Sequence, residues 1–233
     1  AAAMILAVSD AALAQQILPQ ADPADFGLEV PQAPPKPGDG RIVQVRGPND
    51  GPVVGRILVE VGDRLVVMLP NGRVASVSRE AAAETDRPFV PATQDEMIAE
   101  LTAGTFKDFQ TRKTRRYVYV YNASDAFYRA TSRLLETMYP SLLAYCKRQK
   151  LDVHDPEVPL VVVMFRTEEE FDAYHEMGEG VVAYYNAVNN YIVMYEQSKM
   201  AEVAPELAVK QSISTIAHEG VHQILHNIGV QQR

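Results

Sequence analysis

Leu160-Val-Val-Val-Met-Phe165 is a run of six apolar residues that begins directly after Pro159. A strand that is apolar on both faces is covered on both faces, so this segment predicts the central strand of a sheet. Upstream, Tyr117 to Tyr121 predicts a second strand, and Ala123 to Lys150 predicts a long amphipathic helix. These three segments together predict a domain in which helices pack on a sheet.

The residues after the central strand alternate between helical and extended patterns. Thr167 to Met177 predicts an acidic helix, whereas Val181 to Tyr185 and Tyr191 to Tyr195 predict a hairpin that turns at Asn189-Asn190. Val209 to His226 carries apolar residues at helical spacing and predicts the last helix. This order of elements predicts an α+β fold with the last helix packed on the sheet.

The main domain has a recognisable start in the sequence. Thr93-Gln-Asp-Glu96 is a capping box, in which a threonine and a glutamate three residues later satisfy the first N–H groups of a helix. It predicts a short helix that runs to Leu101. We therefore expect a linker at residues 81–97 and the main domain at residues 98–233.

Residues 41–80 have a different pattern, with short β-branched runs of period two separated by turn-forming residues. Such a pattern predicts an antiparallel meander. Asn71-Gly72 is the strongest hairpin signal, because both central residues of a type I′ turn need positive φ. We expect this segment to form a small SH3-like β-barrel that precedes the main domain.

The N-terminal residues predict a tether and an export signal. Residues 15–40 hold six of the 15 prolines and few aromatic residues, which predicts a Pro-rich linker. Residues 1–14 end in Ala12-Leu13-Ala14, which fits a signal-peptide cleavage site, so we interpret them as the remnant of a signal peptide. On this interpretation the protein is extracytoplasmic, either periplasmic or secreted; a frayed Ala-rich helix is the alternative.

Composition and charge exclude several functional classes. The net charge of −8 disfavours a nucleic-acid partner, because binding to phosphates needs a basic surface. No stretch approaches the ~20 apolar residues that a membrane-spanning helix needs. Cys146 is the only cysteine, which excludes an intramolecular disulfide and a multi-cysteine zinc site. A metal ion would therefore be bound by histidines and carboxylates.

The last predicted helix contains His218-Glu219-Gly220-Val221-His222. Residues four apart lie on the same face of a helix, so His218 and His222 can both direct a ring nitrogen at one zinc ion. Glu219 is rotated by about 100° from His218 and would lie beside the ion rather than bind it. The pattern predicts zinc as the cofactor, His218 and His222 as ligands, and Glu219 as the catalytic general base.

The third zinc ligand is not evident from the sequence. His226 continues the spacing of four, but eight residues separate it from His218, which is ~12 Å along a helix and too far to share one ion. No acidic residue follows His222. We therefore expect the third ligand beyond Arg233, in a domain that the sequence truncates at its C-terminus.

Two tyrosines of the predicted hairpin are candidate oxyanion donors. Tyr184 or Tyr185 could donate a hydrogen bond to the oxygen that becomes negatively charged during hydrolysis. Packing in the core is the alternative role for both side chains.

Several blocks of the main domain, in the same order, resemble a known family. From about Phe106 to Arg233 the chain is similar to the bacterial domain of unknown function 1570, a peptidase MA-like, gluzincin-like group that is typically exported. The blocks are Phe109-Gln-Thr111, Tyr117-Val-Tyr-Val-Tyr-Asn122, Pro159-Leu-Val-Val-Val-Met-Phe165, Tyr184-Tyr185-Asn186, Thr215-Ile-Ala-His218-Glu219-Gly-Val-His222-Gln223 and Asn227-Ile-Gly229.

The resemblance implies a zincin-like metallopeptidase fold, built on a mixed sheet with the His218–His222 helix. It also implies zinc on His218 and His222, with Glu219 catalytic. Together with the helix pattern it favours an exported metallohydrolase, in particular a peptidase, whose substrate is a peptide or protein. The alternative is a non-catalytic extracytoplasmic binding protein, in which the zincin-like domain is a scaffold and the module at 41–80 recruits a cell-wall component or a protein partner.

Overall fold

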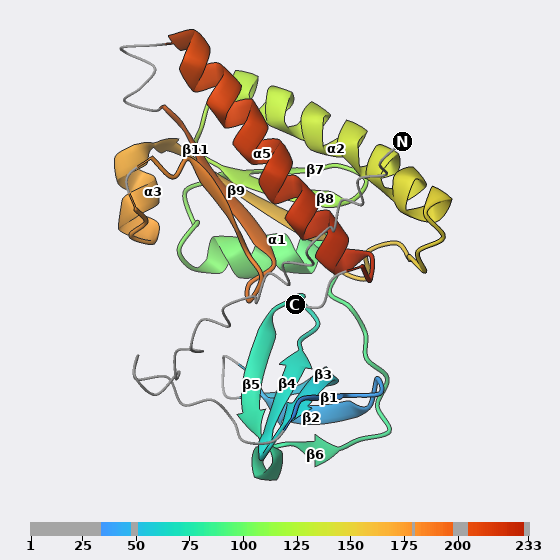
Figure 1. Ribbon diagram of the computed structural model, residues 1–233. Coiled ribbons are helices and arrows are strands. Elements are labelled where there is room, and N and C mark those ends of the chain that lie inside the picture. The colour runs from blue at the N-terminus through green and yellow to red at the C-terminus, as the bar shows by residue number, and fades with distance from the viewer. Residues whose placement is uncertain (1–33, 48–50, 179, 198–204, 231–233) are drawn as a thin grey trace, which may run out of the picture.

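The computed structural model describes residues 34–47, 51–178, 180–197 and 205–230 (Figure 1). The expected signal-peptide remnant at 1–14 lies outside these residues, as does most of the expected linker at 15–40. The described chain forms two sheets, one in the N-terminal part and one, covered by helices, in the C-terminal part. The fold is therefore of the α+β class, as the sequence predicts.

The N-terminal sheet, called the β module below, is antiparallel throughout. Its strand order is β5-β4-β3-β2-β6, with β1 also paired to β3, and these described pairings do not close into a barrel. The first and last strands use residues expected in linkers. The strands are β1 (Lys36–Pro37), β2 (Ile42–Arg46), β3 (Pro52–Val61), β4 (Arg64–Met68), β5 (Val74–Ser78) and β6 (Ala83–Glu84), with a 3₁₀ turn at Arg79–Ala81 before β6.

The hairpin predicted at Asn71-Gly72 is present between β4 and β5, but its turn is not type I′. Gly72 has φ +78°, whereas Asn71 is not among the residues with positive φ. The N–H of Gly72 donates to the carbonyl of Leu69 at 2.9 Å. The Asn71 side chain donates to both carboxylate oxygens of Glu100, at 2.8 and 3.0 Å. The loop is therefore longer than a two-residue turn and is shaped by a contact outside the β module.

The C-terminal part contains a five-stranded mixed sheet in the order β10-β11-β9-β8-β7. Strands β8, β9 and β11 are parallel, and the two edge strands are antiparallel to their neighbours. The predicted central strand is β9. The elements are α1 (Gln94–Ala103), β7 (Gln110–Lys113), β8 (Tyr117–Tyr121), α2 (Asp125–Arg148), β9 (Leu160–Thr167), α3 (Glu168–Tyr174), β10 (Ala183–Asn186), β11 (Tyr191–Gln197) and α5 (Pro205–Asn227).

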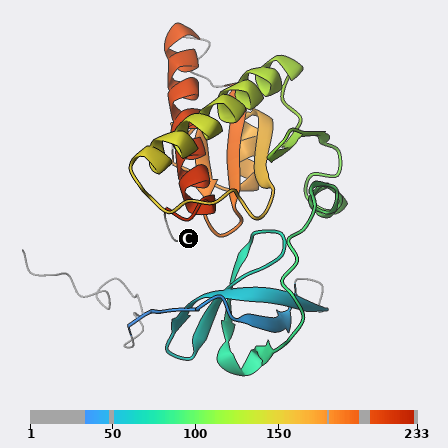
Figure 2. The same ribbon diagram turned by 90° about the vertical axis from the view of Figure 1, so that its right-hand side faces the viewer.

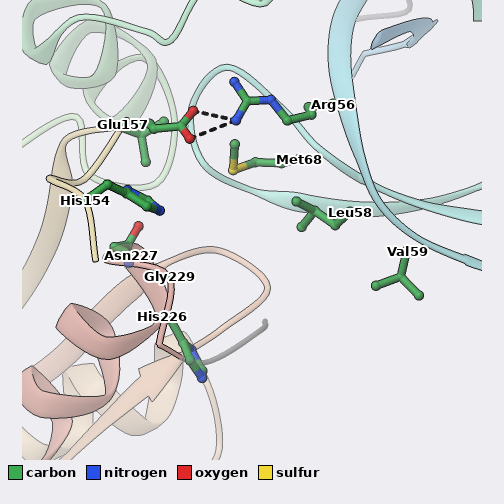
Figure 3. Close-up of a pocket in the computed structure, with 10 residues that line it drawn as sticks. Arg56, Leu58, Val59, Met68, His154, Glu157, His226, Asn227 and Gly229 are labelled. Carbon is green, nitrogen blue, oxygen red and sulfur yellow. Dashed lines mark hydrogen bonds and ion pairs between the residues drawn. The ribbon is translucent and has the colours of Figure 1, made fainter. Parts of the chain in front are cut away.

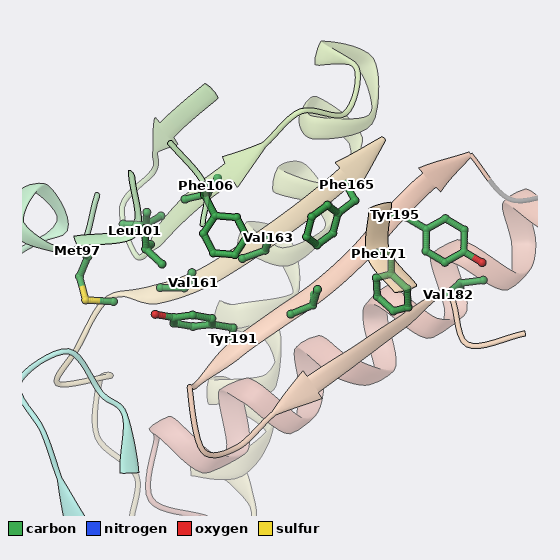
Figure 4. Close-up of a cluster of buried hydrophobic side chains, with 13 residues drawn as sticks. Met97, Leu101, Phe106, Val161, Val163, Phe165, Phe171, Val182, Tyr191 and Tyr195 are labelled. Carbon is green, nitrogen blue, oxygen red and sulfur yellow. The ribbon is translucent and has the colours of Figure 1, made fainter. Parts of the chain in front are cut away.

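Helices cover both faces of this sheet, because alternate residues of its strands point in opposite directions. The three tyrosines of β8 face a core that includes Leu135 of α2 and Ile216 of α5. The intervening valines of β8 face a second core with α1 and α3, shown in Figure 4. Figures 1 and 2 show α2 and α5 together on one side of the sheet. The last helix therefore packs on the sheet, as predicted.

Local signals explain where the helices begin. Thr93 and Glu96 form the predicted capping box at the start of α1, and Thr167 and Glu170 form a second one at the start of α3. Ser124 caps α2 by accepting from the N–H of Phe127, and α2 continues through Pro140. None of the helices in the described ranges is both long and apolar enough to cross a membrane.

Gly220 lies where α5 crosses α2. A Cβ atom at this position would lie 2.4 Å from Cε of Met138 and 2.7 Å from Cδ2 of Leu135, both on α2. Gly disfavours a helix interior by about 1 kcal/mol relative to Ala. Its presence here is explained by the close approach of the two helices.

We expect Gly220→Val to lower the free energy of unfolding by about 1–3 kcal/mol, because its side chain overpacks the contact with Met138 and Leu135. Urea unfolding followed by circular dichroism measures the effect. Ser214→Val places the same side chain at an exposed position of α5 and is the matched control. Equal stability of the two variants would contradict the close-packing role of Gly220.

Candidate metal site

The structure brings His218 and His222 together on α5. Their Nε2 atoms are 3.0 Å apart, and their ring centroids are 4.6 Å apart. His218 is exposed and His222 is half-buried. Each ring therefore directs its Nε2 atom at a common point near the surface of the helix.

This donor pair fits a zinc ion. Two nitrogens that bind zinc tetrahedrally at 2.0–2.1 Å are separated by about 3.3–3.4 Å, so the pair needs to open by only a few tenths of an ångström. Within the described parts of the chain, no group of three His, Cys, Asp or Glu side chains could hold a metal ion. His218 and His222 could thus supply two ligands, and the described residues offer no group of three.

Glu219 lies between the histidine pair and the sheet. Its Oε2 accepts a hydrogen bond of 2.8 Å from the backbone N–H of Tyr185, which belongs to the edge strand β10. The side chain is half-buried. The carboxylate is therefore held in one orientation by a strand that is 34 residues away in sequence.

Strand β10 is an edge strand of the described sheet, paired with β11 alone. In an antiparallel pair, backbone groups point alternately toward and away from the partner strand. The carbonyl of Val182 accepts a hydrogen bond from the N–H of Tyr195, and the carbonyl of Asn186 accepts one from the N–H of Asn190. The N–H of Tyr185 instead points to Glu219. The backbone groups of Ala183 and Tyr185 therefore point away from β11, on the side where α5 carries Glu219.

A buried network of amides, which the sequence patterns did not predict, connects α5 to the sheet. Asn190 and Asn227 exchange two hydrogen bonds, of 3.0 and 2.7 Å, between their side-chain amides. The amide nitrogen of Gln223 donates to the carbonyls of Val161 and Asn190 at 3.0 and 2.8 Å. All three side chains are buried. The network therefore fixes α5 to β9 and to the β10–β11 loop directly after His222.

A signal for this network exists in the sequence. Gln223 and Asn227 are polar residues four apart, on a helix whose neighbouring residues Ile224 and Ile228 are fully buried. A polar pair on a buried face needs partners inside the protein. The partner cannot be read from the sequence, because Asn190 occupies a turn, with φ +64°.

The two candidate oxyanion donors lie on opposite faces of the sheet. Tyr184 packs against the core that contains α1 and α3, with its ring 5.6 Å from that of Phe171. Tyr185 packs on the face of α2 and α5, and its hydroxyl donates to Oδ1 of Asn190 at 2.9 Å. The structure does not bring Tyr184 to the histidine pair, and it engages the Tyr185 hydroxyl in the buried network.

His226 is not part of the histidine pair. Its ring lies 5.2 Å from that of Tyr185, and it lines a cavity of about 200 Å³ between the β module and the end of α5. Figure 3 shows His226 and Asn227 on one side of this cavity, with Met68 and Leu58 on the β module. The Arg56–Glu157 ion pair, 2.7 Å long, closes another side.

A comparison with protein families gives a match at the C-terminal end of the chain. The model of a family described as "Protein of unknown function (DUF1570)" matches residues 212–233. The match includes the histidine pair, Glu219, Gln223 and Asn227, and it supports the DUF1570 resemblance for this segment. The four blocks between Phe109 and Asn186 lie outside the matched residues. A comparison with curated proteins found no match.

Asn227→Ala tests the amide network. We expect it to lower the free energy of unfolding by about 1–3 kcal/mol, because Asn190 loses its reciprocal partner in a buried position. The measurement is urea unfolding followed by circular dichroism, since the chain has no Trp. Asn189→Ala, at the neighbouring residue of the same turn, is the control. A loss no greater than that of the control would argue against the network.

Alkaline pH tests the position of Tyr184. Burial raises its pKa to about 12. Because the unfolded pKa is about 10, the stability contributed by the neutral phenol is complete below pH ~10 and is lost as the pH rises toward 12. Between about pH 9.5 and 11.5, we expect the free energy of unfolding to fall less with pH in Tyr184→Phe than in the wild type. Tyr145→Phe, at an exposed side chain, should keep the wild-type decline.

Proposed function

We propose that the protein is an exported zinc-dependent metallohydrolase, in particular a peptidase, with His218 and His222 as zinc ligands and Glu219 as general base. The observation that carries the proposal is the arrangement of three side chains. The two histidine Nε2 atoms face each other at 3.0 Å, and the carboxylate next to them is held by the edge strand. The DUF1570 match covers all three residues.

The chemistry follows from these groups. Zinc, when bound, would lower the pKa of water and polarise a carbonyl group. Glu219 is held through Oε2 by the N–H of Tyr185, so Oε1 is the atom that we assign to accept a proton from water. The hydrogen bond fixes the carboxylate in advance, so less reorientation is needed when the proton moves.

The edge strand favours an extended peptide as the substrate. Peptides bind such edges by adding a strand, with backbone hydrogen bonds for affinity and side-chain pockets for specificity. The N–H of Tyr185 is already bonded to Glu219, so a peptide would pair with the outward-pointing backbone groups of Ala183, two residues earlier on the same edge. A peptide paired with this edge would pass next to the proposed general base.

Further parts of the proposal rest on the sequence. We propose that the C-terminal part is a zincin-like, peptidase MA-like domain and that the β module is SH3-like. We also propose an extracytoplasmic location and a cell-wall or protein partner for the β module. The mixed sheet with α5 packed beside its edge strand is compatible with the first of these.

Zinc content and turnover test the proposal together. The protein, expressed from the longest natural reading frame that contains this segment, should hold about one zinc per chain by elemental analysis. We expect His222→Ala to lose the zinc, because one of two facing ligands is removed. Glu219→Gln should keep the zinc and lose cleavage of a quenched-fluorescent peptide library by about 10²–10⁴-fold.

His175→Ala removes an exposed histidine outside the pair and is the matched control, which should keep both zinc and activity. Absence of zinc from the wild-type protein would overturn the metallohydrolase proposal. In that case the second candidate, a non-catalytic extracytoplasmic binding protein, would be favoured. One observation supports this candidate: the described residues contain two facing ligands and no cluster of three.

A further inference from the structure

The loop between β4 and β5, Leu69 to Arg73, joins the β module to the C-terminal part of the protein. Directly after it, the N–H of Val74 donates to the carbonyl of Val188 in the β10–β11 loop, at 2.7 Å. Within it, Asn71 donates to the carboxylate of Glu100 on α1. The N–H of Ala92 donates to the carbonyl of Pro70, also in this loop. The loop is therefore tied to both α1 and the β10–β11 loop.

Gly72 packs directly against residues of the C-terminal part. It has φ +78°, and a Cβ atom there would lie 2.8 Å from Cγ2 of Val158 and 3.1 Å from Nδ2 of Asn190. The nitrogen of Asn190 is the atom that donates to Asn227. The backbone of the β4–β5 loop therefore covers the central amide of the network that holds α5.

Asn190 transmits this contact to the candidate site by two routes. Its side chain and its carbonyl hold Asn227 and Gln223, and Gln223 directly follows the proposed ligand His222. Its Oδ1 also accepts from the hydroxyl of Tyr185, whose N–H holds Glu219. The ligand helix and the strand that orients the general base therefore share one buried partner, which the β module covers.

We propose that the β4–β5 loop is a positioning element of the metal site, acting through Asn190, and that Gly72 is its key residue. The proposal rests on the proposed metal-binding function for its consequence. On this view, the β module is more than a recruiting domain, because its loop sets the position of α5 relative to β10. The metal site then depends on the β module being folded and docked.

The experiment compares Gly72→Ala with Gly62→Ala. Gly62 also has positive φ, +58°, in the β3–β4 turn of the same module, but a Cβ atom there meets nothing within 4 Å. Both variants thus carry the strain of an L-residue at positive φ, and only Gly72→Ala presses on Asn190 and Val158. Two readouts are used on the full chain: cobalt(II) titration followed by its visible absorption, and hydrogen–deuterium exchange of residues 218–227 without metal.

We expect Gly72→Ala to raise the cobalt Kd by about tenfold relative to Gly62→Ala, which is the size of effect that supporting residues have on metal affinity. Exchange of residues 218–227 should be faster in Gly72→Ala alone, while the β2–β3 peptides exchange equally in both variants. Identical cobalt Kd and identical α5 exchange in the two variants would overturn the inference.

The exchange readout separates this inference from the proposed function. If the wild-type chain binds no cobalt but α5 still exchanges faster in Gly72→Ala, the metal function is wrong and the coupling to α5 stands. If the wild type binds cobalt and Gly72→Ala changes neither readout relative to its control, the metal function stands and the positioning role is wrong.

Discussion

The paired hydrogen bonds between the side-chain amides of Asn190 and Asn227 are the contact on which the candidate site depends. Both amides are buried. If one of them moves away, the other is left without its hydrogen-bond partner, which costs about 1–3 kcal/mol. An apolar contact would tolerate rotation and sliding of α5. The amides accept only the arrangement in which their donors and acceptors match, and they thereby specify how the helix lies on the sheet.

The sequence predicts those features of the fold that arise from neighbouring residues. The apolar run of β9, the capping box at Thr93 and the spacing of His218 and His222 are local patterns, and each occurs in the structure as predicted. Strand β7 was not predicted. Its residues Gln110 to Lys113 are polar, and they are extended because β8 offers an open edge to pair with.

The same reasoning explains what the sequence could not supply at the candidate site. The convergence of the two histidines follows from helical spacing alone. The bond from Tyr185 to Glu219 joins residues 34 apart, and Asn190 and Asn227 are 37 apart, so both depend on how the hairpin meets the helix. The turn at Asn71-Gly72 was misassigned for a related reason. Glu100, which accepts the hydrogen bonds of Asn71, lies outside the β module and 29 residues along the chain, whereas turn rules consider only neighbouring residues.

The arrangement of α5 explains how one helix can be bound to the sheet and also carry the candidate metal site. At about 100° per residue, Ile216, Gly220, Gln223 and Asn227 share one face, which packs on α2 and the sheet. The face of His218 and His222 lies about 150° away from it, toward solvent.

Glu219 lies about 70° from the buried face, at the border between the two, where the edge strand reaches it. A shift of α5 by one residue would rotate the helix by about 100°, which would remove Glu219 from Tyr185 and bring a charged or bulky side chain to the position of Gly220. The motif therefore needs the helix in one rotational setting, and the buried amides of Gln223, directly after the second histidine, and Asn227, one turn further on, supply that setting.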